Sequence, residues 1–304
     1  MPLRRTLART SLAAFVSIVG LQASAFGAQA GASTVKLHVD PNPGVPTPCV
    51  ASPHSCGYPD AATTGVPAGV TLTKSSSIIV RTAGASLSGL DVNGSVQVAA
   101  NNVTIQNSRI TCGAGCASHF TIEVRPGVTG VVIRDTEASG TTSVGAVIGG
   151  GGTFTLLRGN LHGGIDGVHV ASGTTVQDSY IHDLEPSLIS HDDTIQQIAA
   201  SADRVSVIHN TLLPYSSTTH VYNNSAYICG SQCVATTNMV FTDNLMNGGS
   251  HTLQCSPAGA VHNVFARNRF SNEYRFGPVS PDCKTVAGNS FDTSNVMDGT
   301  NVAV

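Results

Sequence analysis

A short phrase of alternating apolar and polar residues recurs along the chain, and this repeat constrains the fold more than any other feature. Its first copy is Val-Thr-Ile-Gln-Asn-Ser-Arg-Ile at 103–110. If the last apolar residue of each copy is taken as a register mark, the marks fall at 110, 138, 161, 181, 213, 246, 270 and 291. Alternation with a period of two is typical of a strand with one buried face. Each copy therefore predicts a strand, followed by a Gly- or Asn-containing break and a second short strand.

Repeats of twenty-odd residues cannot bury their apolar faces alone, so they must stack on one another. The leucine framework of a leucine-rich repeat is missing, and the repeats are too short for a four-stranded propeller blade. With 32 Gly, no Trp and only 11% charged residues, the composition also argues against a coiled coil or a helical bundle. The sequence predicts an all-β fold, a single-stranded right-handed parallel β-helix of about 8–10 coils. We place the coils at 67–295 and a C-terminal tail at 296–304.

The first thirty residues have the pattern of a secretion signal. Three arginines open the segment, an apolar run follows at 11–21, and 28–30 reads Ala-Gln-Ala, the small-x-small pattern of a cleavage site. The apolar run is too short for a stable transmembrane helix. We therefore expect a secreted, extracellular protein with no membrane attachment after cleavage. Residues 31–66 are expected to form an N-terminal extension and cap that contains a disulfide.

Charge limits the partners of the mature chain. Of 15 Lys and Arg, three are lost with the signal, so 12 basic residues face 18 acidic ones and the net charge becomes −6. Nucleic-acid binding requires a basic face, so it is not expected. We expect a monomer.

All eight cysteines lie in the mature part of the chain. An even number in a secreted chain favours disulfides. Zinc sites need CxxC-type clusters, in which two residues separate the cysteines. Here at least three residues separate the members of each pair, and Gly residues flank them. We expect four disulfides: Cys49 with Cys56, Cys112 with Cys116, Cys229 with Cys233, and Cys255 with Cys283.

Two segments and the repeat together resemble a known fold family. Residues 56–60 read Cys-Gly-Tyr-Pro-Asp and residues 64–69 read Thr-Gly-Val-Pro-Ala-Gly. These segments resemble the opening of secreted actinobacterial β-helix proteins, and the whole mature chain resembles the pectin-lyase-like β-helix superfamily. The resemblance implies export and the coil fold, but no particular activity.

Histidine and aspartate residues concentrate in the central coils. Alignment of the repeats places His162 beside His182, and Asp166 beside Asp193, on adjacent coils about 4.8 Å apart. Asp192 adds a third carboxylate. Six of the eleven histidines fall within 59 residues: His162, His169, His182, His191, His209 and His220.

Such a cluster suits the cleavage of a polysaccharide. Hydrolysis uses one protonated carboxyl and one carboxylate, about 5 to 9.5 Å apart, and stacked acids repel so that one pKa rises. Clustered acids can instead bind Ca²⁺ and promote β-elimination from a uronate. Lys is absent between Lys74 and Lys284, so a lyase would use His, Tyr or Arg as its base.

The acidic segments also resemble those of a hydrolase family. Gly164-Ile165-Asp166-Gly167 and Asp192-Asp193-Thr194-Ile195 are similar to the Asn-Thr-Asp-Gly and Asp-Asp-Cys-Ile segments of polygalacturonase-type hydrolases. The similarity implies that Asp166, Asp192 and Asp193 are the catalytic carboxylates. The chain departs from that pattern at Gly164, Ile165 and Thr194, and no Gly-His-Gly or Arg-Ile-Lys segment follows.

Three hypotheses remain open. The leading one is a secreted enzyme that cleaves a polysaccharide, with uronate polymers among the candidates and hydrolysis slightly favoured. The second is a polysaccharide lyase with a His or Tyr base, and the third is a non-catalytic carbohydrate-binding or adhesion protein. In the leading hypothesis the catalytic group comprises Asp166, Asp192, Asp193, His191 and His169, with Ca²⁺ as a candidate ligand of the three carboxylates. Substrate-binding roles are predicted for His162, His182, His220, Tyr222 and Arg275. The structural alternative is that the histidines form a ladder and the aspartates cap turns.

Overall fold

The computed structural model describes residues 47–113, 116, 118–185, 191–214, 224–230, 233–256 and 258–304. These residues belong to a single compact unit, Gly44–Val304. The predicted signal segment and the first part of the predicted extension lie outside the described residues. Among the residues that are described, no helix is long and apolar enough to cross a membrane.

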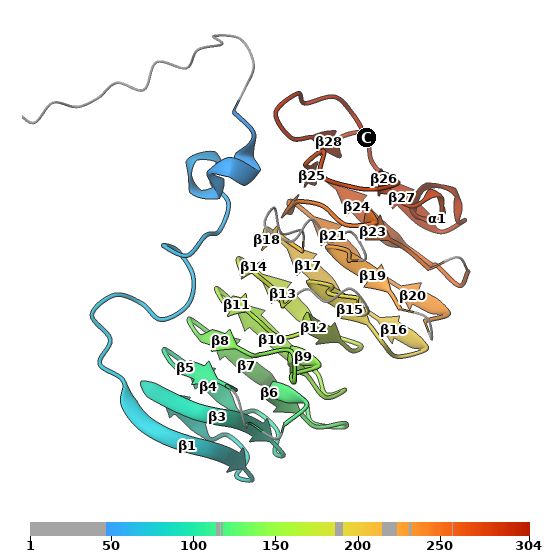
Figure 1. The fold of residues 1–304 in the computed structure, drawn as a ribbon. Helices are drawn as coiled ribbons and strands as arrows, with labels where there is room; N and C mark the ends of the chain where they lie inside the picture. The colour runs from blue at the N-terminus through green and yellow to red at the C-terminus, as the bar shows by residue number, and fades with distance from the viewer. Residues whose placement is uncertain are drawn as a thin grey trace, which may run out of the picture. The chain divides into compact units, whose positions relative to one another are not determined.

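The described residues fold almost entirely as parallel β-structure, in three series of strands that each advance along the chain (Figure 1). The first series is β5 (Arg109–Thr111), β8 (Glu137–Ser139), β11 (Asn160–His162), β14 (Tyr180–His182), β18 (Thr211–Leu212), β22 (Leu245–Met246), β25 (Arg269–Phe270) and β28 (Val296–Met297). The second is β1 (Thr73–Val80), β3 (Leu90–Val98), β6 (Phe120–Val124), β9 (Ala146–Gly149), β12 (Asp166–Val170), β15 (Ile195–Gln197), β19 (Tyr227–Cys229), β23 (His251–Gln254) and β26 (Gly277–Val279).

The third series is a separate sheet, and shorter elements complete the unit. Its strands are β2 (Ser86–Ser88), β4 (Thr104–Gln106), β7 (Val131–Arg134), β10 (Phe154–Leu157), β13 (Thr175–Gln177), β17 (Ser206–Ile208), β21 (Val240–Thr242), β24 (Asn263–Ala266) and β27 (Asn289–Phe291). The remaining elements are the pair β16 (Ser201–Asp203) and β20 (Ala235–Thr237), the 3₁₀ turns η1 (Cys49–Ala51) and η2 (Pro53–Cys56), and the helix α1 (Pro281–Thr285). This all-β architecture is compatible with a parallel β-helix.

The repeat sets the register of the first series. Ile110, Ala138, Leu161 and Ile181 are partners on successive strands, as their register marks predict. Two marks are wrong. The residue paired with Ile181 is Leu212, one position before the predicted mark at 213. Phe291 pairs with Phe265 in the third series, and the first series ends instead at Met297, which lies in the predicted tail.

Each phrase also bends in its middle, which the prediction of one strand per copy does not anticipate. In the first copy β4 ends at Gln106, β5 begins at Arg109, and Asn107 between them has a φ of 49°. The equivalent residues in later copies, such as Asp135 and Arg158, have φ of 49° and 50°. A left-handed residue turns the chain sharply, so the two halves of a phrase join different sheets.

A column of buried asparagines follows this corner in the C-terminal coils. Asn210, Asn244, Asn268 and Asn295 are each shielded from solvent. The Asn244 side chain donates to the Val207 carbonyl and to Oδ1 of Asn268, while its own Oδ1 accepts from Asn210. Because the amides of Asn210, Asn244 and Asn268 are each paired with the coil on either side, the column fixes the stacking of the coils.

The described part of the N-terminal extension crosses successive coils. The Val50 amide donates to Asp298 near the end of the chain at 2.9 Å, and the Gly65 amide donates to the Arg158 carbonyl at 2.9 Å. The trace then enters β1 (Figure 1). Residues 47–66, the described part of the predicted extension and cap, therefore follow the side of the coils.

All four predicted disulfides are confirmed: Cys49–Cys56, Cys112–Cys116, Cys229–Cys233 and Cys255–Cys283. The last joins β23 to α1, and the first closes a small loop within η1 and η2.

Candidate functional site

The predicted carboxylates come together on β12 and at the entrance to β15. Val168 pairs with Ile195, which places Asp166 beside Asp193 on neighbouring coils. On the next two coils, Ser225 and then His251 occupy the position equivalent to Asp193. Each lies two residues before a paired residue, since Ile195 pairs with Tyr227 and Tyr227 pairs with Leu253. Stacked strands are about 4.8 Å apart, so His251 lies about 10 Å from Asp193 along the coils. The predicted alignment of Asp166 with Asp193 is confirmed.

Asp166 links the two coils and orients a histidine. Its Oδ2 lies 2.8 Å from His169 Nε2, and its Oδ1 accepts the backbone N–H of Asp193 at 2.9 Å. The Asp166 and His169 side chains are only 7% and 10% exposed. Hydrogen bonds of this kind stabilise a carboxylate and fix the position of the imidazole ring.

Asp193 is in a different environment from Asp166. Its side chain is completely buried, and among the described residues neither carboxyl oxygen has a hydrogen-bond partner of normal geometry. Burial raises the pKa of Asp193 well above the ordinary value, and the nearby Asp166 and Asp192 raise it further. The Ser225 backbone N–H opposes these effects only in part. The two neighbouring carboxyl groups thus differ in their hydrogen bonding.

The other two predicted catalytic residues flank this pair. Asp192 is buried beside Asp193, whereas His191 is exposed. The three aspartates are therefore enclosed and do not line an exposed groove. Within the described residues, no three His, Cys, Asp or Glu side chains are arranged to hold a metal ion.

The predicted histidine pair lies on the first series of strands. His162 pairs with His182, as predicted, and their ring centroids are 5.5 Å apart. His162 Nε2 lies 3.3 Å from the Glu137 carboxylate. This hydrogen bond is the largest effect that lowers the pKa of Glu137, although burial opposes it. Arg109 lowers that pKa further.

His182 is held from both sides. Its Nδ1 lies 2.6 Å from the Asp183 carboxylate, its Nε2 lies 2.9 Å from Asn160 Oδ1, and the Tyr180 ring stacks on it at 3.9 Å. Burial lowers the pKa of His182, while the hydrogen bond to Asp183 opposes the change. Burial raises the pKa of Tyr180 to about 12. Because each ring is packed and hydrogen-bonded, the pair also fits the structural ladder that the sequence leaves open.

Arg275 lies beside an aromatic residue that the sequence predictions omit. Its guanidinium sits 5.0 Å from the centre of the Phe276 ring, and His251 lies 5.7 Å from the same ring. Phe276 is 65% exposed. Gly277 pairs with His251 on the preceding coil. Arg275 and Phe276, which directly precede Gly277, therefore lie one coil beyond His251, next to the row formed by Asp166, Asp193, Ser225 and His251. The signal in the sequence is an aromatic residue directly after Arg275. His220 and Tyr222 lie outside the described residues.

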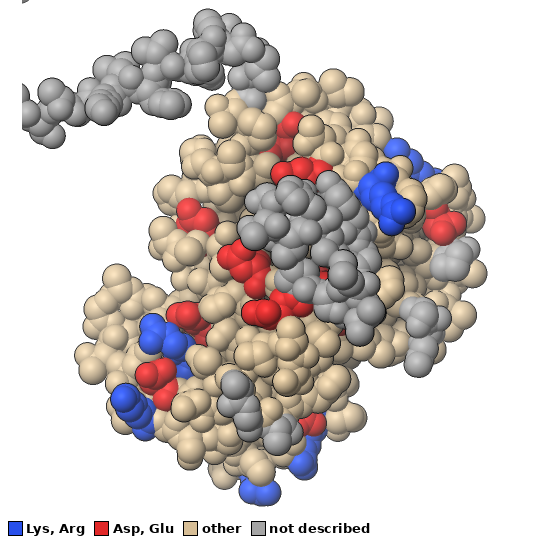
Figure 2. Space-filling model, viewed as in Figure 1, with Lys and Arg blue, Asp and Glu red and all other residues tan. Residues whose placement is uncertain are grey.

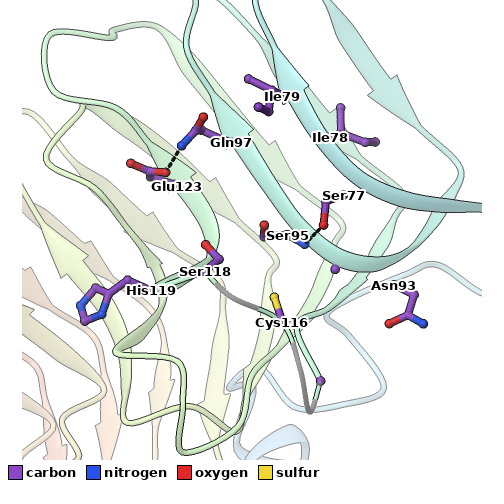
Figure 3. Close-up of a pocket in the computed structure, with 12 residues that line it drawn as sticks. Ser77, Ile78, Ile79, Asn93, Ser95, Gln97, Cys116, Ser118, His119 and Glu123 are labelled. Atoms are coloured by element: carbon purple, nitrogen blue, oxygen red, sulfur yellow. Dashed lines mark hydrogen bonds between the residues drawn. The ribbon is translucent and has the colours of Figure 1, made fainter.

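A second feature missed from the sequence is a cavity of about 640 Å³ between β1, β3 and β6 (Figure 3). Glu123, Gln97 and His119 line it, and the Gln97 amide donates to the Glu123 carboxylate. Phe120 connects the cavity to the carboxylate group, since its ring contacts His119 at 4.7 Å and His169 at 5.7 Å between centroids. The signal in the sequence is a glutamate between Ile122 and Val124 in this strand.

Figure 2 shows acidic side chains gathered near the centre of the viewed face, with most of the basic ones toward its margins.

In comparisons with known proteins, no family model, no curated protein and no solved structure matches the chain.

Proposed function

We propose that the protein is a secreted right-handed parallel β-helix of the pectin-lyase-like type, and that it cleaves a polysaccharide by hydrolysis. The observation that carries the proposal is the pair Asp166 and Asp193. The Asp166 carboxyl accepts two hydrogen bonds. The Asp193 carboxyl is buried, has no partner of normal hydrogen-bond geometry among the described residues, and has a raised pKa. A buried carboxyl with a raised pKa keeps the proton that a general acid must donate.

Asp193, Asp166 and His169 have different roles in the proposed hydrolysis. Asp193, which retains its proton, donates it to the glycosidic oxygen as the bond from carbon to that oxygen breaks. Asp166 accepts a proton from the attacking water, and His169 holds the Asp166 carboxylate in place. Water supplies the hydroxyl that the sugar carbon gains, so the reaction needs no further reactant.

Access to the site requires a local opening, because Asp166, Asp193 and His169 are all buried. In the closed state the exclusion of water from Asp193 preserves its proton. The negative net charge expected of the mature chain favours a neutral polymer over a polyuronate, whose own carboxylates would be repelled.

A polysaccharide panel tests this proposal. The mature chain is incubated with neutral and acidic polymers, and both new reducing ends and the ultraviolet absorbance of unsaturated uronates are measured. Reducing ends without the absorbance support hydrolysis. Both signals together would replace hydrolysis with β-elimination, for which a His or Tyr base is the candidate. Neither signal on any polymer, with or without Ca²⁺, would contradict cleavage of those substrates.

A second candidate function, carbohydrate binding without cleavage, is favoured by the exposed Arg275–Phe276–His251 group. An exposed aromatic face with a cation beside it suits stacking on a sugar ring. Binding without product release, retained after Asp193→Asn, would favour this alternative.

A further inference from the structure

The left-handed corner residues of successive coils carry charges of alternating sign. The series is Asp135, Arg158, Asp178, His209, Asp243 and Arg267, with φ between 49° and 61°. Arg158 binds both oxygens of Asp135 at 2.6 and 2.9 Å. Arg267 binds both oxygens of Asp243 at 2.7 and 2.8 Å. His209 occupies the cationic position between these two pairs, and its Nδ1 lies 2.6 Å from Asp178.

His209 differs from the two arginines because its charge depends on pH. Its second nitrogen, Nε2, lies 3.0 Å from the Gly57 carbonyl oxygen. A carboxylate and a carbonyl can only accept hydrogen bonds, so both ring nitrogens must donate. An imidazole donates from both nitrogens only when it is protonated and positively charged.

Gly57 belongs to the segment 47–66, which we call the strap. Tyr58 of the strap stacks on His209 with ring centroids 5.7 Å apart. A cavity of about 270 Å³ lies between the strap and the corner residues. Farther along, a Cβ added to Gly65 would meet the Asn160 side chain at 3.0 Å, so the strap touches the coil that carries His162. His209 therefore joins the middle of the strap to the coils.

We propose that His209 is a pH-sensitive lock on the strap. The charged ring holds the Gly57 carbonyl and Asp178 together. When the ring loses its proton to water, one of the two hydrogen bonds is lost and the attraction to Asp178 and Asp243 disappears. The titratable and charged groups around the ring are His54 and Tyr58 on the strap, and Arg158, Asp178, Asp243 and Arg267 on the coils.

The direction of the pH effect follows from this chemistry. The two hydrogen bonds require the charged ring, so the strap is held in acidic solution and loosens as the pH rises and the ring loses its proton. A charge-assisted hydrogen bond to a partly exposed ring corresponds to about a tenfold change in local opening. Loosening would uncover Asn160 and Glu137, the hydrogen-bond partners of His182 and His162.

The chain itself supplies matched variants for the test. Arg occupies the same corner at positions 158 and 267 with φ of 50° and 55°, and Asn does so at 107 with φ of 49°. His209→Arg therefore keeps a permanent cation in a backbone conformation that Arg already adopts. His209→Asn removes the charge at a corner that also accepts Asn. Neither change touches the carboxylate group on β12 and β15.

Hydrogen exchange of peptides covering 47–66, corrected for the intrinsic effect of pH, is measured at pH 5.5 and 8. We expect exchange in the wild type to be about tenfold faster at pH 8, to stay slow at both pH values in His209→Arg, and to be fast at both in His209→Asn. Peptides covering β13 and β17 report on the coils and should not change. Equal wild-type exchange at the two pH values would overturn the proposal. So would a pH response in His209→Arg as large as that of the wild type.

Discussion

Removing the charge at Asp193 should change how stability depends on pH. The wild-type carboxyl is fully buried, has no partner of normal hydrogen-bond geometry among the described residues, and has a raised pKa. The folded chain consequently holds a proton that the unfolded chain releases above about pH 4. Because the folded state binds more protons, its free energy of unfolding falls as the pH rises through this window.

The magnitude follows from a single proton. Between the unfolded pKa and the raised folded pKa of Asp193, the wild type loses up to about 1.4 kcal/mol of stability per pH unit relative to Asp193→Asn. Two pH units within this window would amount to about 3 kcal/mol. Below about pH 4 the carboxyl is protonated in both states, so the contribution of Asp193 to the pH dependence vanishes there.

Chemical unfolding at several pH values between 4 and 8 measures the difference. Far-ultraviolet circular dichroism is a suitable signal, since the chain has no Trp. Glu185→Gln is the matched control, because it removes one carboxyl from an exposed side chain. The slope of stability against pH is the readout, since the new amide can itself be poorly paired. Parallel curves for the wild type and Asp193→Asn would refute the reasoning, as would a wild type that gains stability relative to Asp193→Asn as the pH rises.

Three further changes test the fold and the binding surface. Asn244→Ala leaves its buried partners unpaired and should cost about 3 kcal/mol in chemical unfolding, whereas exposed Asn93→Ala should change stability little. Opening Cys255–Cys283 by a double Ala substitution should cost about 3.6 kcal/mol and opening Cys49–Cys56 about 2.5 kcal/mol, since the first closes a longer loop; equal losses would contradict this order. Phe276→Ala should weaken oligosaccharide binding about three- to tenfold by calorimetric titration without lowering the melting temperature, and unchanged affinity would exclude stacking there.

Much of the coil arrangement is predictable because the repeat specifies which residues are neighbours. The pairing of His162 with His182, the alignment of Asp166 with Asp193 and the four disulfides all follow from spacing. The errors have local causes. Two leucines, at 212 and 213, compete for one register position, and only Leu212 lies in the strand.

What the sequence does not indicate depends on burial and on contacts between distant segments. The alternation of apolar and polar residues does not reveal that Asp193 is buried. The chain bends at Thr194, directly before β15, so the two-residue period of a regular strand does not apply to Asp193. His209 looks like an ordinary repeat residue until the strap brings Gly57 beside it, 152 positions away in the chain. Phe276 follows Arg275 in the sequence, but its exposure becomes evident only in the structure.

Comparing the wild type with Asp193→Asn on a polysaccharide that the wild type cleaves tests the proposed acid most directly. Cleavage by Asp193→Asn should be about a hundredfold slower or less detectable still, since a general acid contributes at least that factor, while Glu185→Gln should match the wild type. Circular dichroism confirms that both variants are folded. Cleavage by folded Asp193→Asn at the wild-type rate would contradict the assignment of Asp193 as the acid.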